Sequence, residues 1–203
     1  MRTSKPAYLL MTALVATATI SIGLIGCTAA EPLSEQYKQS SKRSGTSDGR
    51  IVEIPIEERG AAVNFSGTTE YGNRISSDDY SGQVYVVNFW YAACGPCIIE
   101  APMLEEVWQS YQDEGVGFLG INIYDQAATA IAFAEENGIT YPSVIDVNDG
   151  RVKQAFAGVT PIQATPTTLV LDREGRVTAR IIGQLESASI LDTLVADTLA
   201  ETS

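Results

Sequence analysis

Cys94 and Cys97 are the residues of this chain best suited to covalent chemistry, because two cysteines separated by two residues can close a small disulfide ring. Such a ring opens by accepting two electrons and can pass them to another protein through a mixed disulfide. Gly95 and Pro96 form the loop between the two sulfurs. A helix beginning at Cys94 would place its thiolate near unpaired backbone N–H groups that stabilise negative charge. We therefore expect Cys94 to be the nucleophile and Cys97 to resolve the mixed disulfide.

The rest of the composition excludes several other chemistries. The chain has three cysteines and no histidine, so it cannot build a Cys/His protease, a Ser/His/Asp hydrolase or a histidine-ligated metal site. Ile98 follows the second cysteine where covalent haem attachment would need histidine. We expect no metal and no cofactor other than the redox-active disulfide itself. The alternative is that the two cysteines are incidental core residues.

A strand and a helix flank the two cysteines. The run 84–90 is almost entirely apolar, which is typical of a strand covered on both faces. After the cysteines, apolar residues recur at helical spacing up to Gly115, which is well placed to end a helix. The disulfide is therefore expected at a strand-to-helix junction.

The remaining segments predict an α/β fold, in which helices flank a mixed central sheet. Periodicity and turn residues predict further strands at 51–56, 61–65, 116–124, 143–147, 167–172 and 177–182, and helices at 126–137, 151–156 and 185–199.

The N-terminus has the pattern of a secretory signal. Arg2 and Lys5 precede an almost uncharged apolar run at 8–25. The run ends in Leu-Ile-Gly-Cys at 24–27, which resembles a bacterial lipobox, so we expect residues 1–26 to be cleaved and Cys27 to carry a lipid anchor. The alternative is an uncleaved transmembrane helix, since about 18 apolar residues are enough to span a bilayer. Both alternatives place the remaining chain outside the cytoplasm, at the outer face of the cell membrane.

Residues 27–50 are polar and small and predict a flexible, lipid-anchored tether, followed by one folded domain at 51–203. The chain carries a formal net charge of -12. Loss of residues 1–26 removes two positive charges and changes the net charge from -12 to -14. An acidic surface repels phosphate backbones, so we expect no nucleic-acid partner. We expect a monomer.

Residues 86–102, which read Val-Val-Asn-Phe-Trp-Tyr-Ala-Ala-Cys-Gly-Pro-Cys-Ile-Ile-Glu-Ala-Pro, resemble the active-site segment of thioredoxin-like proteins of the TlpA/ResA type. The resemblance implies a thioredoxin-like fold with an N-terminal β extension and a βα insertion. Residues 164–168 resemble the segment of this family that holds a cis-proline beside the disulfide. Pro166 is the matching proline, and the Thr165 backbone would pair with an extended substrate segment.

Glu100 lies three residues after Cys97, on about the same helix face. In the resembling proteins a glutamate here lines a cavity near the cysteines and handles protons, and burial would raise its pKa into a useful range. The alternative is a solvated helix charge. Two departures stand out: Ala93 occupies the place where the family commonly has tryptophan, and Asn88 replaces the buried aspartate of cytoplasmic thioredoxins.

The resemblance implies a protein-disulfide reductase that acts on exported proteins, with oxidised apocytochrome c as the leading substrate during cytochrome c maturation. A membrane thiol-disulfide carrier would donate the electrons. One alternative is an oxidase or isomerase that forms disulfides in exported proteins. Another is a redox-inert lipoprotein that uses the fold for binding. A peroxide reductase is disfavoured, because its lone cysteine with a supporting threonine and arginine is not evident.

Overall fold

The computed structural model of the protein describes residues 48–201. The predicted signal segment, the predicted anchor at Cys27 and nearly all of the predicted tether lie outside the described residues. Among the residues described, no helix has the length and apolar character needed to cross a membrane.

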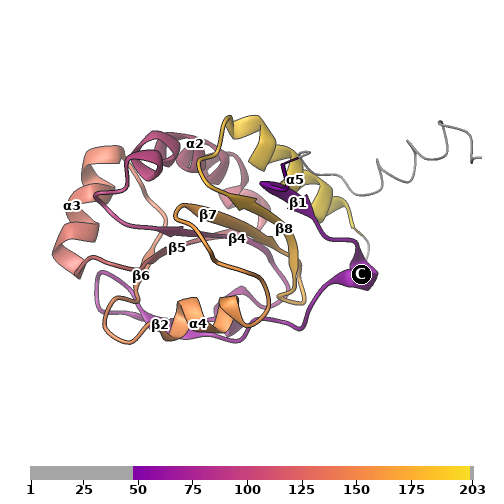
Figure 1. Ribbon diagram of the computed structural model, residues 1–203, viewed down its shortest axis with the longest axis horizontal. Coiled ribbons are helices and arrows are strands. Elements are labelled where there is room, and N and C mark those ends of the chain that lie inside the picture. The colour runs from indigo at the N-terminus through magenta and orange to yellow at the C-terminus, as the bar shows by residue number, and fades with distance from the viewer. Residues whose placement is uncertain (1–47, 202–203) are drawn as a thin grey trace, which may run out of the picture.

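A six-stranded mixed sheet lies at the centre of the described chain, with strand order β1-β8-β7-β4-β5-β6 (Figure 1). β4 pairs in parallel with β5 and antiparallel with β7, and β5 pairs in parallel with β6. β7 and β8 form an antiparallel hairpin, and β1 adds antiparallel to β8 at the edge. The strands are β1 (Ile51–Glu53), β4 (Val84–Trp90), β5 (Val116–Asn122), β6 (Ser143–Ile145), β7 (Thr167–Leu171) and β8 (Val177–Ile182).

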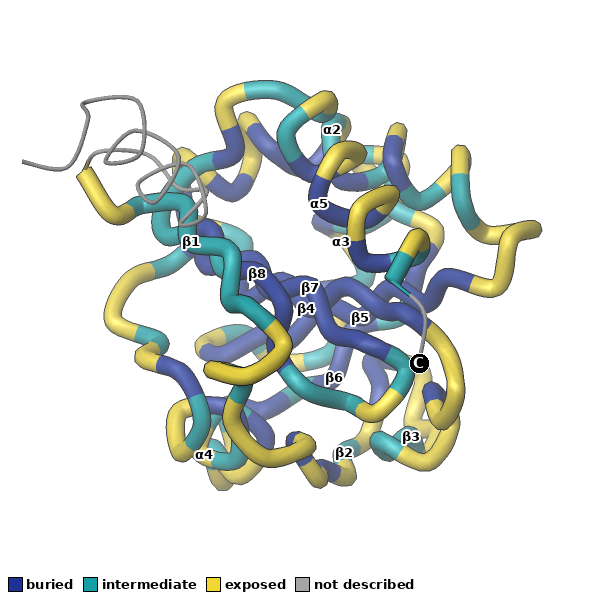
Figure 2. Tube along the Cα trace, turned by 90° about the vertical axis from the view of Figure 1, so that its right-hand side faces the viewer, coloured by how far each residue is buried: buried dark blue, intermediate teal, exposed yellow. Residues whose placement is uncertain are grey.

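Helices cover both faces of this sheet, which confirms the predicted α/β class. α2, α3 and α5 lie on one side, and α4 with a small hairpin of β2 and β3 lies on the other, in both views (Figures 1 and 2). The helices are α2 (Gly95–Tyr111), α3 (Ala127–Asn137), α4 (Arg151–Ala157) and α5 (Ala188–Ala200), with short 3-10 helices η1 (Ile56–Glu58), η2 (Ser77–Tyr80) and η3 (Gln112–Glu114). The small hairpin joins β2 (Ser66–Thr68) to β3 (Arg74–Ser76).

The central strand β4 is buried along its whole length, because it lies between the two helical layers. Val86 belongs to the cluster formed with α2 and α5, whereas Val87 belongs to the cluster formed with α4. Buried residues fill β4, β5 and β7 at the centre of Figure 2. The unbroken apolar run in the sequence therefore reports a strand with no solvent-facing side.

The strand-to-helix junction has the predicted form. β4 ends at Trp90, and Cys94 is the N-cap residue of α2. Pro96 occupies the first turn of the helix, where the missing N–H costs no helical hydrogen bond. The helix continues through Pro102, and Gly115 closes the following 3-10 turn with a φ of 77°. That left-handed conformation favours glycine.

The predicted strand at 61–65 is wrong. Val63 and Phe65 are buried as their alternation indicated, but these residues form no strand. The Val63 N–H donates to the Gly175 carbonyl (2.9 Å), and the Phe65 carbonyl accepts from the Ser77 N–H (3.1 Å). These two hydrogen bonds join different segments of the chain and do not pair one strand with another. The alternation therefore identified the buried side chains but not a strand.

Several further boundaries differ from the predictions, including the end of β5, which lies at Asn122 and not at 124. Strand β6 stops at Ile145 instead of continuing to 147, and β1 stops at Glu53. Helix α5 begins at Ala188, three residues later than predicted, because Ser187 is still extended. The hairpin of β2 and β3 was not predicted. Its Thr69 bridges to Val144 beside the sheet edge.

Candidate active site

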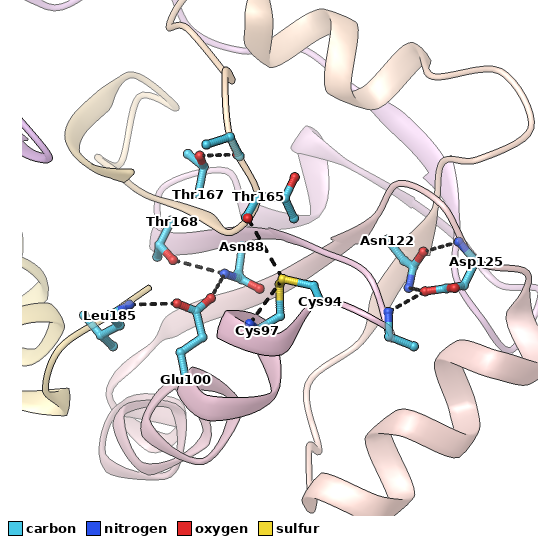
Figure 3. The surroundings of a disulfide bond; sticks show 12 residues. Asn88, Cys94, Cys97, Glu100, Asn122, Asp125, Thr165, Thr167, Thr168 and Leu185 are labelled. Carbon is cyan, nitrogen blue, oxygen red and sulfur yellow. Dashed lines mark hydrogen bonds between the residues drawn. A yellow bond between two sulfur atoms is a disulfide. The ribbon is translucent and has the colours of Figure 1, made fainter. Parts of the chain in front are cut away.

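Cys94 and Cys97 form a disulfide at the N-terminus of α2 (Figure 3), with their Cα atoms 5.2 Å apart. The Cys94 Sγ accepts a hydrogen bond from the Cys97 N–H (3.2 Å). The structure thus places the Cys94 sulfur at the helix entrance, as predicted. Both cysteines are buried, Cys94 at 3% and Cys97 at 2% exposure.

The segment before β7 lies directly beside the disulfide. The Thr165–Pro166 peptide bond is cis, as predicted. The Thr165 carbonyl oxygen lies 3.9 Å from the Cys94 Sγ (Figure 3). The Thr167 hydroxyl donates to the Ala164 carbonyl (2.7 Å), and the Gly183 N–H donates to the Pro166 carbonyl (2.8 Å). The loop is therefore held by hydrogen bonds on both sides of Pro166, next to the Cys94 sulfur.

Glu100 is fully buried, so the alternative that it is a solvated charge on the helix surface is wrong. Its Oε1 accepts a hydrogen bond from the Asn88 Nδ2 (2.8 Å), and its Oε2 accepts one from the Leu185 N–H (2.9 Å). Burial raises the pKa of Glu100 to about 7, while the two hydrogen bonds oppose that shift by favouring the charged form. The carboxyl group can consequently gain or lose a proton near neutral pH.

Asn88 links the central strand to both sides of the site. Its Nδ2 donates to Glu100 and also to the Thr168 Oγ1 (3.0 Å). β4, α2 and β7 thus meet through one amide group, close to the disulfide (Figure 3). An asparagine suits this position, because its two N–H bonds serve two acceptors at once.

Asp125 and Asn122, neither of which was predicted as a site residue, hold the loop that leads into Cys94. The Asp125 Oδ2 accepts hydrogen bonds from the Ala92 N–H (2.6 Å) and from the Asn122 Nδ2 (2.9 Å). Asn122 is fully buried, and its Oδ1 accepts from the N–H groups of Tyr124 and Asp125 (3.2 and 2.7 Å). A usable signal was available, because parallel strands end at the same edge of a sheet and β5 ends beside β4.

An apolar cluster lies behind the disulfide. Trp90, Phe133 and Ala101 pack with Cys97, and the Trp90 and Phe133 rings lie 4.5 Å apart. Phe89 is fully buried in the cluster on the other face of the sheet. Phe89 and Trp90 are therefore both core residues. Ala93, Gly95 and Pro96 remain exposed beside the sulfurs.

This fold and this site define a thioredoxin-fold thiol-disulfide oxidoreductase: a βα junction carries a disulfide, a cis-proline lies next to it, and a central mixed sheet supports both. Residues 59–180 match the AhpC/TSA family, and the chain belongs to that family.

Named relatives agree with this class. The chain is 38% identical over 112 residues to the thiol-disulfide oxidoreductase ResA of Geobacillus thermodenitrificans, a match that covers 55% of this chain and 62% of that protein. Identity to ResA of Geobacillus kaustophilus is 34% over 129 residues, covering 64% and 71%. A secreted thiol-disulfide isomerase from Corynebacterium glutamicum superposes with a TM-score of 0.66 at 28% identity, covering 75% of this chain and 95% of that one.

Proposed function

We propose that this protein is a membrane-tethered, extracytoplasmic reductase of disulfides in exported proteins. The observation that carries the proposal is the Cys94–Cys97 disulfide at the start of α2, with Thr165 beside it and Glu100 buried behind it. Backbone N–H groups at a helix N-terminus stabilise a thiolate, and a carboxyl group that titrates near neutral pH can exchange protons with thiols. Both features suit a disulfide that opens and closes during each cycle.

The reaction begins with the reduced protein. The Cys94 thiolate attacks one sulfur of a partner disulfide, so that a Cys94–partner disulfide forms and the other partner sulfur leaves as a thiolate and takes up a proton. The Cys97 thiolate then attacks the Cys94 sulfur and releases the second partner thiol. Two electrons pass to the partner, and the product is the Cys94–Cys97 disulfide found in the structure.

Glu100 would serve the second step. Cys97 must lose a proton before it attacks, and Glu100 follows it by three residues on α2, where side chains lie on nearly the same face. With a pKa of about 7, the ionised carboxylate can accept that proton and return it when the protein is recharged.

Thr165 and Pro166 would align the partner. A backbone carbonyl next to the Cys94 sulfur offers an acceptor to an extended partner segment, in the manner of an added strand. Such pairing would place the partner cysteine in line with Cys94.

The proposed location follows from the N-terminal sequence, in which the signal pattern and the lipobox ending at Cys27 precede the tether. The secreted relative from Corynebacterium glutamicum supports an extracytoplasmic setting. A membrane thiol-disulfide carrier would recharge Cys94 and Cys97. Oxidised apocytochrome c, whose Cys-x-x-Cys-His segment must be reduced before haem attachment, is the proposed substrate.

An oxidase or isomerase of exported proteins is the second candidate, favoured by the name of the same secreted relative. The two functions need different redox poise. A reducing protein of this fold has a potential of about -270 mV, whereas a strong oxidant has a potential of about -120 mV.

The test measures the reduction potential of the protein and traps its mixed disulfide with the substrate. The reduction potential of the purified full chain is measured in thiol/disulfide buffers, and we expect a value near the reducing end of that range. Cys97→Ser should accumulate mixed disulfides with the natural substrate in cells, and the Cys94→Ser/Cys97→Ser double variant is the control that should accumulate none. A potential close to about -120 mV would reject the reductase in favour of the oxidase. Unchanged function in cells carrying Cys94→Ser would leave the redox-inert binding protein as the better account.

A further inference from the structure

Two neighbouring isoleucines lie exposed beside the disulfide. Ile98 and Ile99 are 45% and 55% exposed and directly follow Cys97. Single exposed apolar residues are common on protein surfaces, but a cluster next to a reactive group indicates contact with a partner. Among the exposed large apolar residues of the described chain, these two follow the disulfide directly in the sequence.

The helix geometry places this pair within one turn of the Cys94 loop, which a partner has to approach. The Ile98 N–H donates to the Cys94 carbonyl (3.1 Å), so Ile98 lies one helical turn after the reactive sulfur, and Ile99 lies one turn after the exposed Gly95. Cys94 itself is only 3% exposed. Because the sulfur is recessed, a chain that forms a disulfide with it has to contact the surrounding surface.

Two stretches of the chain next to the disulfide carry no charge, although the protein is strongly acidic. No charged residue occurs from Tyr80 to Ile99, and none occurs from Gln154 to Leu171, the stretch that contains Thr165. The chain as a whole carries a net charge of -12. A charged partner residue packed against the isoleucines would lose part of its hydration, which is costly. The nearby Asp125 carboxylate already accepts hydrogen bonds from the Ala92 N–H and the Asn122 amide.

We propose that Ile98 and Ile99, with the exposed Ala93 and Pro96 beside them, form a docking surface that selects partner segments with uncharged, apolar side chains next to the attacked cysteine. The occupant is the stretch of the partner protein that carries the disulfide, since that stretch has to approach the recessed Cys94 sulfur at the start of α2, where these residues lie exposed. The inference rests on the proposed thiol-disulfide exchange and adds the class of substrate segment. Selection acts by burying apolar surface and by excluding charge.

The experiment compares peptide disulfides that differ only in the residues flanking the cysteine. The reduced full chain is mixed with leucine-, lysine- or glutamate-flanked versions, and each rate constant is divided by the rate constant for hydroxyethyl disulfide, so that changes in Cys94 reactivity cancel. Lysine and glutamate are both needed because the acidic chain attracts one and repels the other. We expect the leucine peptide to react about tenfold faster than either charged peptide.

Ile98→Ser/Ile99→Ser should bring that ratio close to one. Ile56→Ser is the matched control, because Ile56 is equally exposed at 51% but lies in η1, away from the disulfide, and it should keep the wild-type ratio. Equal rates for the three peptides with the wild-type chain, or an unchanged ratio in the double variant, would overturn the docking surface. Failure of the wild-type chain to react even with hydroxyethyl disulfide would instead reject the proposed redox function itself.

Discussion

The pKa of the Glu100 carboxyl group is the result of opposing effects within a single residue's surroundings. Its two hydrogen-bond donors, the Asn88 amide and the Leu185 N–H, favour the carboxylate, but complete burial favours the neutral acid and prevails. The resulting pKa of about 7 means that the group changes its charge within the pH range where thiols are exchanged.

The first prediction concerns stability and Glu100→Gln. Because the folded pKa of Glu100 lies above its ordinary value of 4.5, the folded state holds a proton that the unfolded state has already released. Stability is therefore lost as the pH rises through about 7. The free energy of unfolding of the oxidised wild type, minus that of Glu100→Gln, should fall by about 3 kcal/mol between pH 4.5 and 8. Urea unfolding across this range measures the difference.

Glutamine cannot ionise, so its own hydrogen-bonding cost appears as a constant offset and not as a slope. A difference that stays flat with pH would contradict the raised pKa of Glu100.

At the residue scale, the sequence predicts those site residues whose signal lies within one short segment. Cys94, Cys97 and Glu100 share a fixed spacing, and Pro166 precedes a predicted strand. Asp125 was not predicted as a site residue because its partner is the backbone N–H of Ala92, and such a contact leaves no pattern of side-chain types in the sequence. The contact from Leu185 to Glu100 was hidden for the same reason.

At the scale of elements, the loop between β5 and α3 fixes the loop between β4 and α2. Asp125 accepts a hydrogen bond from the N–H of Ala92, two residues before Cys94, and the Ile123 N–H donates to the Trp90 carbonyl (3.1 Å). The position of Cys94 therefore depends on a neighbouring strand as well as on its own helix.

The second prediction tests this dependence with Asp125→Ala and Asp125→Asn. Alanine leaves the Ala92 N–H and the Asn122 amide without their acceptor, which should cost about 1–3 kcal/mol of stability and slow disulfide exchange at Cys94. Asparagine keeps a side-chain oxygen and should recover most of both. Urea unfolding and stopped-flow exchange with a peptide disulfide provide the two measurements.

Asp79→Ala is the matched control, because Asp79 also accepts a backbone N–H, from Ser76 (2.7 Å), but in the capping box of η2. It should lower stability without slowing exchange. Equal exchange rates for Asp125→Ala and the wild type would show that the Cys94 loop does not need this anchor.

The elements also mark the limit of pattern-based prediction. The long buried strand β4 and the helix α2 were predicted because burial on two faces and a helical stripe leave clear periodicity. The alternation at 61–65 identifies which side chains are buried, but burial against a sheet does not require membership in it. β2 and β3 are three residues each and mostly polar or half-buried, so their periodicity is too short to detect.

At the scale of the whole molecule, the described chain enters the fold at the end of the sheet that carries the disulfide. The Arg50 guanidinium donates to the carbonyls of Ile182 and Gln184 (3.3 and 3.0 Å). Ile182 pairs with Thr167, which follows Pro166. The first described residues are therefore fastened at the end of the sheet that carries the cis-proline.

A buried arginine side chain lies at the opposite end of the sheet from the disulfide. The Arg59 side chain is 3% exposed and forms ion pairs with Asp172 (3.0 Å) and Glu201. Its Nε also donates to the Ile54 carbonyl (3.0 Å). One side chain thus joins the N-terminal segment, the turn between β7 and β8 and the residue that follows α5.

The third prediction is that Arg59→Met lowers the free energy of unfolding by about 3 kcal/mol. Removing one member of a buried ion pair leaves the other charge without compensation, which typically costs about 3–5 kcal/mol. The lower value is expected because Arg176 also contacts Asp172 (2.9 Å).

Arg151→Met is the control, since the Arg151 side chain is 80% exposed in its pair with Asp149, and such pairs contribute less than about 1 kcal/mol. Similar unfolding midpoints for the two variants would show that Arg59 does not join these three segments energetically. The disulfide lies at the other end of the sheet, so the exchange rate of folded Arg59→Met should match that of the wild type.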